Sequence, residues 1–285
     1  MNDAWAYICS IESKCTMQLP TYFISHGGGP WPYMPEYRKS LQGLERSLAD
    51  IPRQIGTTPK AVLMISGHWE GSAFAVSSSP KPPMIYDYYG FPAHTYTVTY
   101  DAPGSPELAQ QVHGLIAAAG LPTALDAQRG YDHGTFTPMV VIYPEANVPV
   151  VQVSMHANYD PAAHMALGRA LAPLRNEGVL IIGSGLSYHN LRAMGPVAKA
   201  PSMAFDAWLQ QTVVASTSAE RVARLRDWAS APAARQAHPQ EDHLIPLMVA
   251  VGAAQDEAAT CCYHEDNVMG GMTVSSFRFG AAANP

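Results

Sequence analysis

The chain has 285 residues, of which 47% are hydrophobic and 14% are charged, and its formal net charge is −6. This length suits one large α/β domain or two small ones, and the low charged fraction indicates a large buried core. The acidic balance and the lack of a long basic run argue against nucleic acid as a partner. No apolar run is long enough to cross a bilayer, so no membrane-spanning segment is expected.

The cysteines and the first twenty residues indicate in which cellular compartment the protein is expected. The cysteines are Cys9, Cys15, Cys261 and Cys262. They lack the paired short spacing of a zinc ribbon, so free thiols in a reducing cytoplasm are the simplest interpretation. The N-terminal stretch lacks the sustained apolar centre of a signal peptide. We therefore predict a cytoplasmic protein with an N-terminal extension over residues 1–19. Residues 20–285 are expected to form one domain, because no internal repeat or linker divides them.

The order of strand and helix signals along the chain predicts an α/β fold. Short apolar or β-branched runs predict strands at residues 22–25, 61–66, 73–77, 123–126, 148–154, 179–183 and 272–279. Helical spacing of apolar residues predicts helices over residues 35–51, 106–119, 161–174, 202–216, 219–228 and 243–253. The runs at 61–66 and 179–183 are nearly all apolar, which is typical of strands buried on both faces.

The stretch from residue 79 to residue 104 is rich in proline and tyrosine and poor in aliphatic residues. It is too long and irregular for a simple connection, and such loops commonly serve as lids or binding loops. Its ring-bearing side chains could line an aromatic pocket or could pin an ordered surface loop, and the sequence leaves both alternatives open. These side chains are Tyr86, Tyr88, Tyr89, Phe91, His94 and Tyr96.

Histidines follow the carboxyl ends of three predicted strands. His26 directly follows the strand predicted at 22–25, and His68 lies two residues after the strand at 61–66. His189 lies six residues after the strand at 179–183. Buried strands of an α/β sheet present their ligands at their carboxyl ends. We therefore expect these three histidines to share one site.

Five of the eleven histidines lie in turns flanked by glycine or acidic residues: His26, His68, His133, His189 and His243. Neutral imidazole is a common ligand of iron and zinc, and such a cluster fits a mononuclear metal site. Any one of these histidines alone is more often a structural residue, so the prediction depends on the whole group. Acidic neighbours that could orient the histidines are Glu70, Asp132 and Asp242.

Five motifs occur in the order SHGGGP at 25–30, SGHWE at 66–70, YDHG at 131–134, GSG at 183–185 with HNL at 189–191, and DHLIPL at 242–247. The set resembles the class III extradiol ring-cleavage dioxygenases. The resemblance is greatest to the DOPA 4,5-dioxygenase branch, which is related to the β-subunit of protocatechuate 4,5-dioxygenase. YGFP at 89–92, APGSPEL at 102–108 and SFRF at 276–279 also look like that branch, and the similarity extends from about residue 20 to residue 280.

The resemblance implies a single α/β domain with a central mixed, largely β core flanked by helices, and a mononuclear non-haem Fe(II) site. His26 and His68 match the two histidine ligands, and His243 matches a third position that this branch fills with histidine. The protocatechuate enzymes use glutamate there, so the all-histidine set departs from the usual two-histidine, one-carboxylate triad and also suits Zn(II). His189 matches a position treated either as an extra ligand or as a catalytic base. His133 matches a second acid/base histidine.

The expected reaction inserts both atoms of O₂ into a catechol-type ring and opens it. Because a catechol binds a metal through both oxygens, at least one phenol proton must leave, and histidine is a suitable base near neutral pH. We assign His189 as this base and His133 as the acid, with a purely orienting role as the alternative. Tyr89 and His94 are expected to contact the substrate. Arg278 is expected either to neutralise a substrate carboxylate or to form a structural salt bridge.

Two other functions stay open on the sequence alone. One is a zinc-dependent hydrolase that uses the same histidines to activate water, and the other is a non-catalytic protein that binds a metal or an aromatic ligand. The expected partners are a small aromatic diol and O₂, without nucleic acid or membrane, in a monomer or homodimer. Of the remaining histidines, His156 could face the pocket and His113 could pack on a helix. Three are predicted to lie at the surface: His164, His238 and His264.

Overall fold

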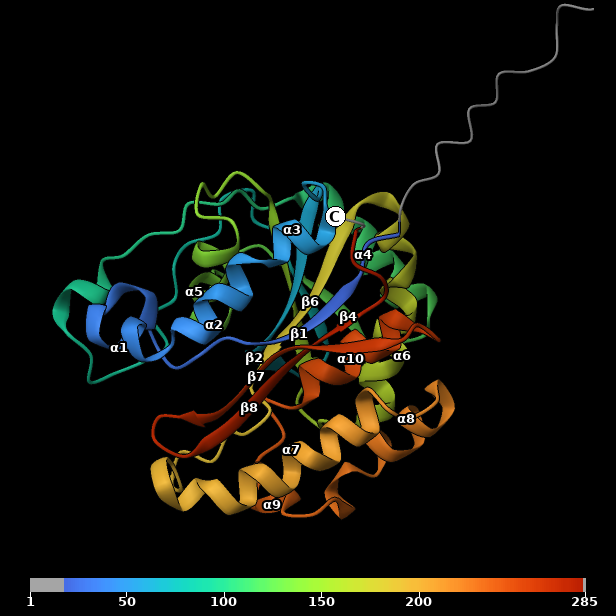
Figure 1. The fold of residues 1–285 in the computed structure, drawn as a ribbon. Helices are drawn as coiled ribbons and strands as arrows, with labels where there is room; N and C mark the ends of the chain where they lie inside the picture. The colour runs from blue at the N-terminus through green and yellow to red at the C-terminus, as the bar shows by residue number, and fades with distance from the viewer. Residues whose placement is uncertain (1–17, 284–285) are drawn as a thin grey trace, which may run out of the picture.

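The computed structural model describes residues 18–283, which fold around one eight-stranded sheet with the order β4-β3-β5-β2-β6-β1-β8-β7 (Figure 1). The strands are β1 (Thr21–Ser25), β2 (Ala61–Gly71), β3 (Phe74–Ser77), β4 (Thr123–Asp126), β5 (Val150–His156), β6 (Val179–Gly185), β7 (Ala259–Val268) and β8 (Met272–Phe279). The predicted N-terminal extension lies almost entirely outside the described residues. Its last residue, Leu19, is buried and donates its backbone N–H to Arg175 O.

The sheet is mixed, with a parallel centre and antiparallel additions. Strands β5, β2, β6 and β1 run parallel to one another, β8 runs antiparallel to β1, and β3 runs antiparallel to β5. The central strands are nearly continuous apolar runs because their two faces are both covered. The predicted α/β class, with a mixed central sheet flanked by helices, is confirmed.

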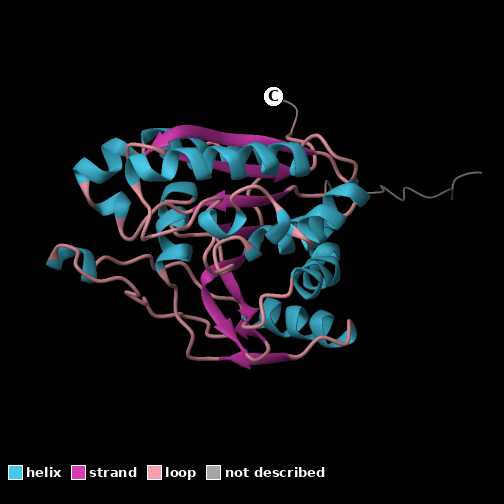
Figure 2. Cartoon of the chain, turned by 90° about the horizontal axis from the view of Figure 1, so that it is seen from below, coloured by secondary structure: helices cyan, strands magenta, loops and turns pink. Residues whose placement is uncertain are grey.

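Helices and long connections lie on both sides of the sheet (Figure 2). The α-helices are α1 (Pro35–Ser40), α2 (Gln42–Ala49), α3 (Ile51–Ile55), α4 (Pro106–Ala118), α5 (His133–Ile142), α6 (Pro161–Leu171), α7 (Lys199–Val213), α8 (Ser218–Arg226), α9 (Ala234–Ala237) and α10 (Ile245–Ala254). Short 3-10 helices are η1 (Trp31–Tyr33), η2 (Ala93–Tyr96), η3 (Ala172–Glu177), η4 (Gly195–Ala198) and η5 (Trp228–Ser230). Within residues 18–283, no helix combines the length and the apolar character needed to span a bilayer.

Neighbouring residues of β6 show that α5 and α10 occupy opposite faces of the sheet. Gly183 faces the backbone of Pro246 at the start of α10, whereas Ser184 donates a hydrogen bond to Gly134 O in α5. Successive residues of a strand point to opposite faces. The N-terminal ends of α5 and α10 therefore approach the same end of β6 from its two sides.

Helix α10 is apolar on every side and is buried between β6 and α6. Glycines permit its close approach to both neighbours. A Cβ on Gly183 of β6, or on Gly168 of α6, would lie 2.2 Å from a backbone carbonyl oxygen of α10. A Cβ on Gly252 of α10 would lie 2.2 Å from Met165 O in α6. The backbone of α10 thus contacts the backbones of β6 and α6 with no side chains between them. These contacts fix the position of the N-terminal end of α10 relative to the sheet.

The structure differs from the predicted elements in three places. The helix expected over residues 35–51 is divided into α1, α2 and α3, and the last contains Pro52 in its first turn, where proline is tolerated. The periodicity does not predict α5, because this helix contains Pro138 and begins at a His-Gly pair. The apolar pattern also misses β7, which pairs only with β8 at the sheet edge and exposes charged residues such as Asp266.

Two histidines predicted to lie at the surface are fully buried, so that prediction is wrong for His164 and His238. His164 packs edge-on against Phe74, with ring centroids 5.3 Å apart. His238 packs against Phe205 and Trp228 and forms a 3.0 Å hydrogen bond to a backbone carbonyl through Nε2. Both imidazoles pack as aromatic rings in the interior, a role that polarity patterns do not reveal.

We predict that Gly252→Ala destabilises the protein, because the added methyl group meets the Met165 carbonyl oxygen in a close-packed interior. Overpacking of this kind costs about 1–3 kcal/mol. Gly114→Ala is the matched control, since Gly114 also lies in a helix but a Cβ there meets no atom within 4 Å. The control should gain roughly 0.5–1 kcal/mol. Urea unfolding followed by circular dichroism measures both changes, and an unaltered midpoint for Gly252→Ala would contradict the packing described.

Candidate metal centre and active site

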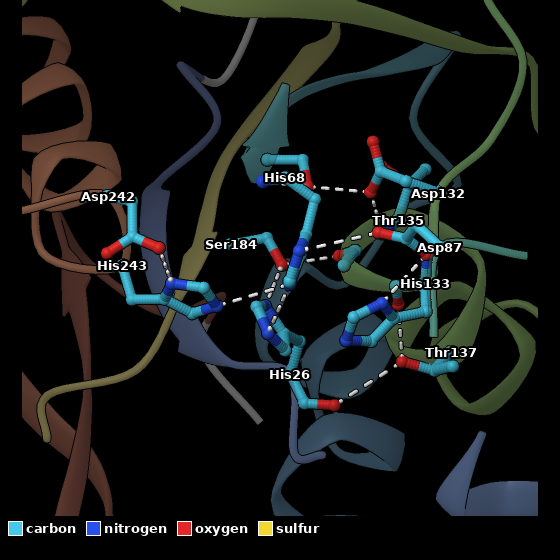
Figure 3. Close-up of polar contacts among 12 residues, drawn as sticks. His26, His68, Asp87, Asp132, His133, Thr135, Thr137, Ser184, Asp242 and His243 are labelled. Carbon is cyan, nitrogen blue, oxygen red and sulfur yellow. Dashed lines mark hydrogen bonds and ion pairs between the residues drawn. The ribbon is translucent and has the colours of Figure 1, made fainter. Parts of the chain in front are cut away.

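The five histidines predicted to share a site line one cavity at the carboxyl ends of the central strands. His26 follows β1, His68 lies in β2, His133 begins α5, His189 lies in the loop after β6, and His243 lies just before α10. Figure 3 shows four of these rings, from His26, His68, His133 and His243, gathered in one region. They meet because β1, β6 and β2 are adjacent and parallel, so their carboxyl ends share one edge of the sheet.

The glycine turn after β1 fixes the backbone of His26. Gly27 has a φ of 78°, in the left-handed region that favours glycine. A Cβ on Gly27 would lie 2.5 Å from Trp31 Nε1, and this indole nitrogen donates a 2.8 Å hydrogen bond to His26 O. Glycine therefore lets the buried indole of Trp31 lie directly against the turn and hold the carbonyl group of His26.

The Nε2 atoms of three histidines converge on one point. His68 Nε2 lies 3.2 Å from His26 Nε2 and 3.1 Å from His243 Nε2 (Figure 3). The tautomer of His26 follows from its other nitrogen, because Nδ1 lies 3.0 Å from Ser184 Oγ. Ser184 donates its only proton to a backbone carbonyl, so its oxygen can only accept from His26 Nδ1. The proton of His26 is therefore on Nδ1, and its Nε2 presents a lone pair.

Carboxylates lie beside Nδ1 of the other two rings, His243 and His68, and favour the same tautomer. Asp242 Oδ2 lies 2.8 Å from His243 Nδ1, and Asp87 Oδ2 lies 3.4 Å from His68 Nδ1. Because a carboxylate favours the proton on the nitrogen that faces it, each neutral ring has an unprotonated Nε2. Three lone pairs then lie together, an arrangement that a cation between them stabilises. Nitrogen ligands about 2.1 Å from one ion lie about 3.0–3.4 Å apart in octahedral or tetrahedral geometry, so the donor set fits a divalent metal.

Burial keeps these three imidazoles neutral. Burial, assisted by the neighbouring histidine charges, lowers the pKa of His68 to about 4. The same cause holds the pKa values of His26 and His243 well below their usual range. Metal ligation requires neutral imidazole, so all three rings are in the ligand form at neutral pH.

Asp87 joins His133 to this cluster. The Nδ1 and backbone N–H of His133 lie 2.8 and 3.0 Å from Asp87 Oδ1, and its ring centroid lies 4.0 Å from that of His68. Burial opposes ionisation of Asp87, but hydrogen bonds from His133 and the charges of His133 and His68 outweigh it and lower the pKa of Asp87 to about 2. Asp87 is therefore a carboxylate at neutral pH and holds a proton on Nδ1 of His133.

His189 stacks on His243, with ring centroids 3.3 Å apart and ring planes 17° apart. Its Nδ1 lies 3.8 Å from Asp242 Oδ1, so Asp242 is shared between the two rings. Burial opposes ionisation of Asp242, but the nearby His189 and His243 rings, the latter in hydrogen-bond contact, outweigh it and hold the pKa of Asp242 well below its usual range. The backbone N–H of His189 donates to Ala237 O at 2.9 Å and anchors the loop.

The cavity around the histidines has a volume of about 510 Å³, within the range of about 300–1,000 Å³ that is typical of small-molecule sites. Three rings from the long loop between β3 and α4 line it: Tyr88, Tyr89 and Phe91. Tyr89 is 92% exposed and lies at the mouth. Tyr86 and Tyr96 pack against Tyr88. The loop therefore serves both as a pocket wall and as an ordered aromatic cluster.

Two residues predicted to bind substrate do not line the cavity. His94 is exposed, and its Nε2 lies 3.1 Å from Tyr33 O. Arg278 instead donates a 3.0 Å hydrogen bond to Gln54 Oε1. The reason is its register, because Arg278 pairs with Tyr22 near the start of β1, whereas the histidines lie beyond the other end of that strand. The structure therefore does not bring these two residues together with the site histidines.

Neighbouring residues also have different roles from those predicted. Asp132 is buried but does not contact a site histidine, since it accepts from Ser66 Oγ at 2.7 Å and caps α5 through Thr135 N at 3.1 Å. Glu70 is exposed on β2. His156 does not line the cavity, and its Nδ1 accepts a hydrogen bond from the backbone of the following turn.

The sequence patterns do not identify Asp87 or Ser184, although both orient site histidines. The only sequence signal for Asp87 is that no other carboxylate occurs between residues 79 and 100, in a stretch of aromatic residues. Ser184 lies within the GSG motif, where small residues are expected for close packing. Both contacts depend on how distant segments come together, which local patterns do not describe.

Comparisons with known proteins agree on one family. Residues 20–280 match the family described as the catalytic LigB subunit of aromatic ring-opening dioxygenase. A Beta vulgaris protein named "4,5-DOPA dioxygenase extradiol" is 40% identical over 263 residues, which cover 91% of this chain and 96% of that protein. A protein of the same name from Escherichia coli is 31% identical, covering 92% of this chain and 95% of its own length.

The fold also has a solved counterpart. A crystal structure of an uncharacterised protein from Escherichia coli K12 superimposes with a TM-score of 0.72 and 27% identity, covering 92% of this chain and 100% of that chain. The resemblance to the class III extradiol enzymes that the motifs predict is thereby confirmed. Given a family match over nearly its whole length and relatives above 30% identity over nine-tenths of it, this chain belongs to the LigB family and is an extradiol ring-cleavage dioxygenase.

Proposed function

We propose that the enzyme binds one divalent metal ion through Nε2 of His26, His68 and His243 and cleaves a catechol with O₂. The observation that supports this most directly is the pair of Nε2–Nε2 distances, 3.2 Å from His68 to His26 and 3.1 Å from His68 to His243, together with an oxygen beside each Nδ1. Fe(II) is the ion expected for turnover, because when bound it supplies the redox chemistry that O₂ requires. Zn(II) suits the same nitrogen donors. Family membership gives no support to the zinc-hydrolase alternative.

We assign His189 as the base that removes a catechol proton. It lines the cavity, and its Nδ1 lies beside Asp242, so the proton is accepted at Nε2. The Asp242 carboxylate stabilises the imidazolium that results. As a fourth metal ligand, His189 would leave only two of about six positions, too few for a bidentate catechol and O₂. Its stacking on His243 keeps the ring next to the metal position without requiring it to be a ligand.

We assign His133 as the acid that returns a proton during ring opening. Asp87 holds a proton on its Nδ1, so Nε2 is the nitrogen that exchanges a proton with the cavity. The helix N-terminus places this ring, because the backbone N–H of His133 also bonds to Asp87. Tyr88 packs edge-to-face against both Phe91 and His133, so these aromatic rings form the cavity wall beside the proposed acid.

The proposed function is tested by loading the protein with Fe(II) without oxygen and then adding catechol and O₂. We expect a yellow ring-opened product, together with consumption of one O₂ per catechol, which an oxygen electrode measures. The same protein loaded with Zn(II) is the control and should form no product, because Zn(II) has no redox chemistry. A colourless reaction without O₂ uptake in the Fe(II) sample would contradict the proposal.

We predict that His26→Ala, His68→Ala and His243→Ala each lose most of the bound metal, because each removes one of three converging nitrogen donors. His94→Ala is the matched control, since His94 is exposed and lies outside the cavity. Metal content after dialysis, measured by mass spectrometry, distinguishes the variants. A near-normal metal content in any of the three would remove that histidine from the ligand set.

We predict that His189→Ala and His133→Ala keep the metal and still bind catechol anaerobically, but turn over more slowly. General acid–base groups typically contribute about 10²–10⁴-fold to rate, so kcat should fall by this amount. Steady-state kinetics and metal analysis of the same samples separate the two effects. Should His189→Ala fail to hold metal, His189 is an obligatory ligand and the three-histidine account is wrong.

A further inference from the structure

The cavity has a second part that the histidine chemistry does not explain. Strand β8 continues past the end of β1, and α2 packs against β7, so these elements form a wall beyond His26. The wall consists of Leu41, Leu44, Met272 and Val274, which all line the cavity. Each of these side chains is at most 3% exposed. One part of the cavity is therefore polar, around the histidines, and the other is an apolar chamber.

Three polar side chains of the cavity are already paired within the protein. Tyr188 and Tyr263 line the cavity, but their hydroxyl groups donate to a backbone carbonyl and to Glu265. The side chain of Asn190 bonds through Nδ2 to Gln236 O and through Oδ1 to a backbone N–H. The polar groups of these three side chains are therefore engaged within the protein.

The charges around the cavity are also unsuited to an anionic substituent. Among residues 18–283, no lysine or arginine lines the cavity. Asp87 and Asp242 also line it and are paired with site histidines. A substrate carboxylate in the apolar chamber would thus lose its water without meeting a lysine or arginine side chain, which is strongly unfavourable.

Apolar character continues to the mouth of the cavity. Leu191 and Met194 line the entrance and are 68% and 37% exposed, and the exposed ring of Tyr89 lies there too. Large exposed apolar side chains that gather at one opening commonly mark a binding surface. A substituent that extends from the histidines would therefore meet apolar side chains both in the chamber and at the entrance.

We propose that the substrate is a catechol with an uncharged, apolar substituent, such as an alkyl or aryl group, rather than one with a carboxylate or amino-acid side chain. This inference rests on the proposed function, because it places the catechol oxygens at the histidines. The ring then lies against Tyr88 and Phe91, and the substituent occupies the chamber formed by Leu41, Leu44 and Met272. The volume of about 510 Å³ accommodates a substituent in addition to the ring.

The test compares three catechols with the same three-carbon side chain: a propylcatechol, the corresponding dihydroxyphenylpropanoate, and DOPA. For the Fe(II)-loaded protein, kcat/KM should be at least about tenfold higher for propylcatechol than for either charged analogue. Anaerobic calorimetry should give the same order of affinities. Equal or faster turnover of DOPA or the propanoate would overturn the inference and leave the proposed function intact. Turnover of none of them, unsubstituted catechol included, would overturn the proposed function and this inference with it.

A charge introduced at the entrance tests the electrostatic part of the argument. Leu191→Arg places a guanidinium at a largely exposed position, so folding should be unaffected. It should raise kcat/KM for the propanoate relative to propylcatechol by about tenfold. Leu191→Gln is the matched control, which removes the same apolar side chain without adding charge, so it should shift the ratio less than Leu191→Arg does. An equal shift of the kcat/KM ratio in both variants would show that the polarity of the side chain, and not its charge, determines the preference. That result would overturn the proposed role of the absence of lysine and arginine from the cavity.

Discussion

The contact between α10 and β6 is the constraint on which the site depends. A Cβ on Gly185 at the end of β6 would lie 2.1 Å from His243 O, and this carbonyl accepts a hydrogen bond from Leu186 N. The chain entering α10 is thus fastened to the carboxyl end of a central strand, next to the turns that hold His26 and His68. Because α10 is buried between β6 and α6, its first residues have little freedom to shift. The third histidine is therefore placed by backbone contacts rather than by its own side-chain packing.

The protonation of the three histidines placed in this way makes the site suitable for a metal ion. Three neutral imidazoles in a buried position have their protons drawn outward by Ser184, Asp242 and Asp87, so their lone pairs face inward. Without a cation, such an arrangement is repulsive; with one, each nitrogen gains a favourable partner. The low pKa values of the histidines have the same origin, since burial disfavours a charged ring. The protein thus prepares an electron-rich centre before any ion arrives.

Sequence patterns predicted the central strands and the five clustered histidines well, because buried parallel strands are continuous apolar runs whose ends must meet. The patterns were weaker where long-range geometry decides. Asp87 orients two histidines from an irregular loop whose path no periodicity describes. Arg278 was misplaced because the motif near the C-terminus does not reveal that its position in β8 faces the start of β1. The edge strand β7 was missed because its exposed charged residues hide the alternation that a half-buried strand usually shows.

Two carboxylates have matching positions in the site. Asp87 contacts His68 and His133, and Asp242 contacts His243 and His189, so each joins a proposed metal ligand to a proposed proton-transfer residue. Energies of groups that share a partner are not additive. A mutation of either carboxylate will therefore alter both the affinity for the ion and the proton affinity of the paired imidazole. At these two positions, adaptation of the scaffold to a new metal is tied to its acid–base chemistry.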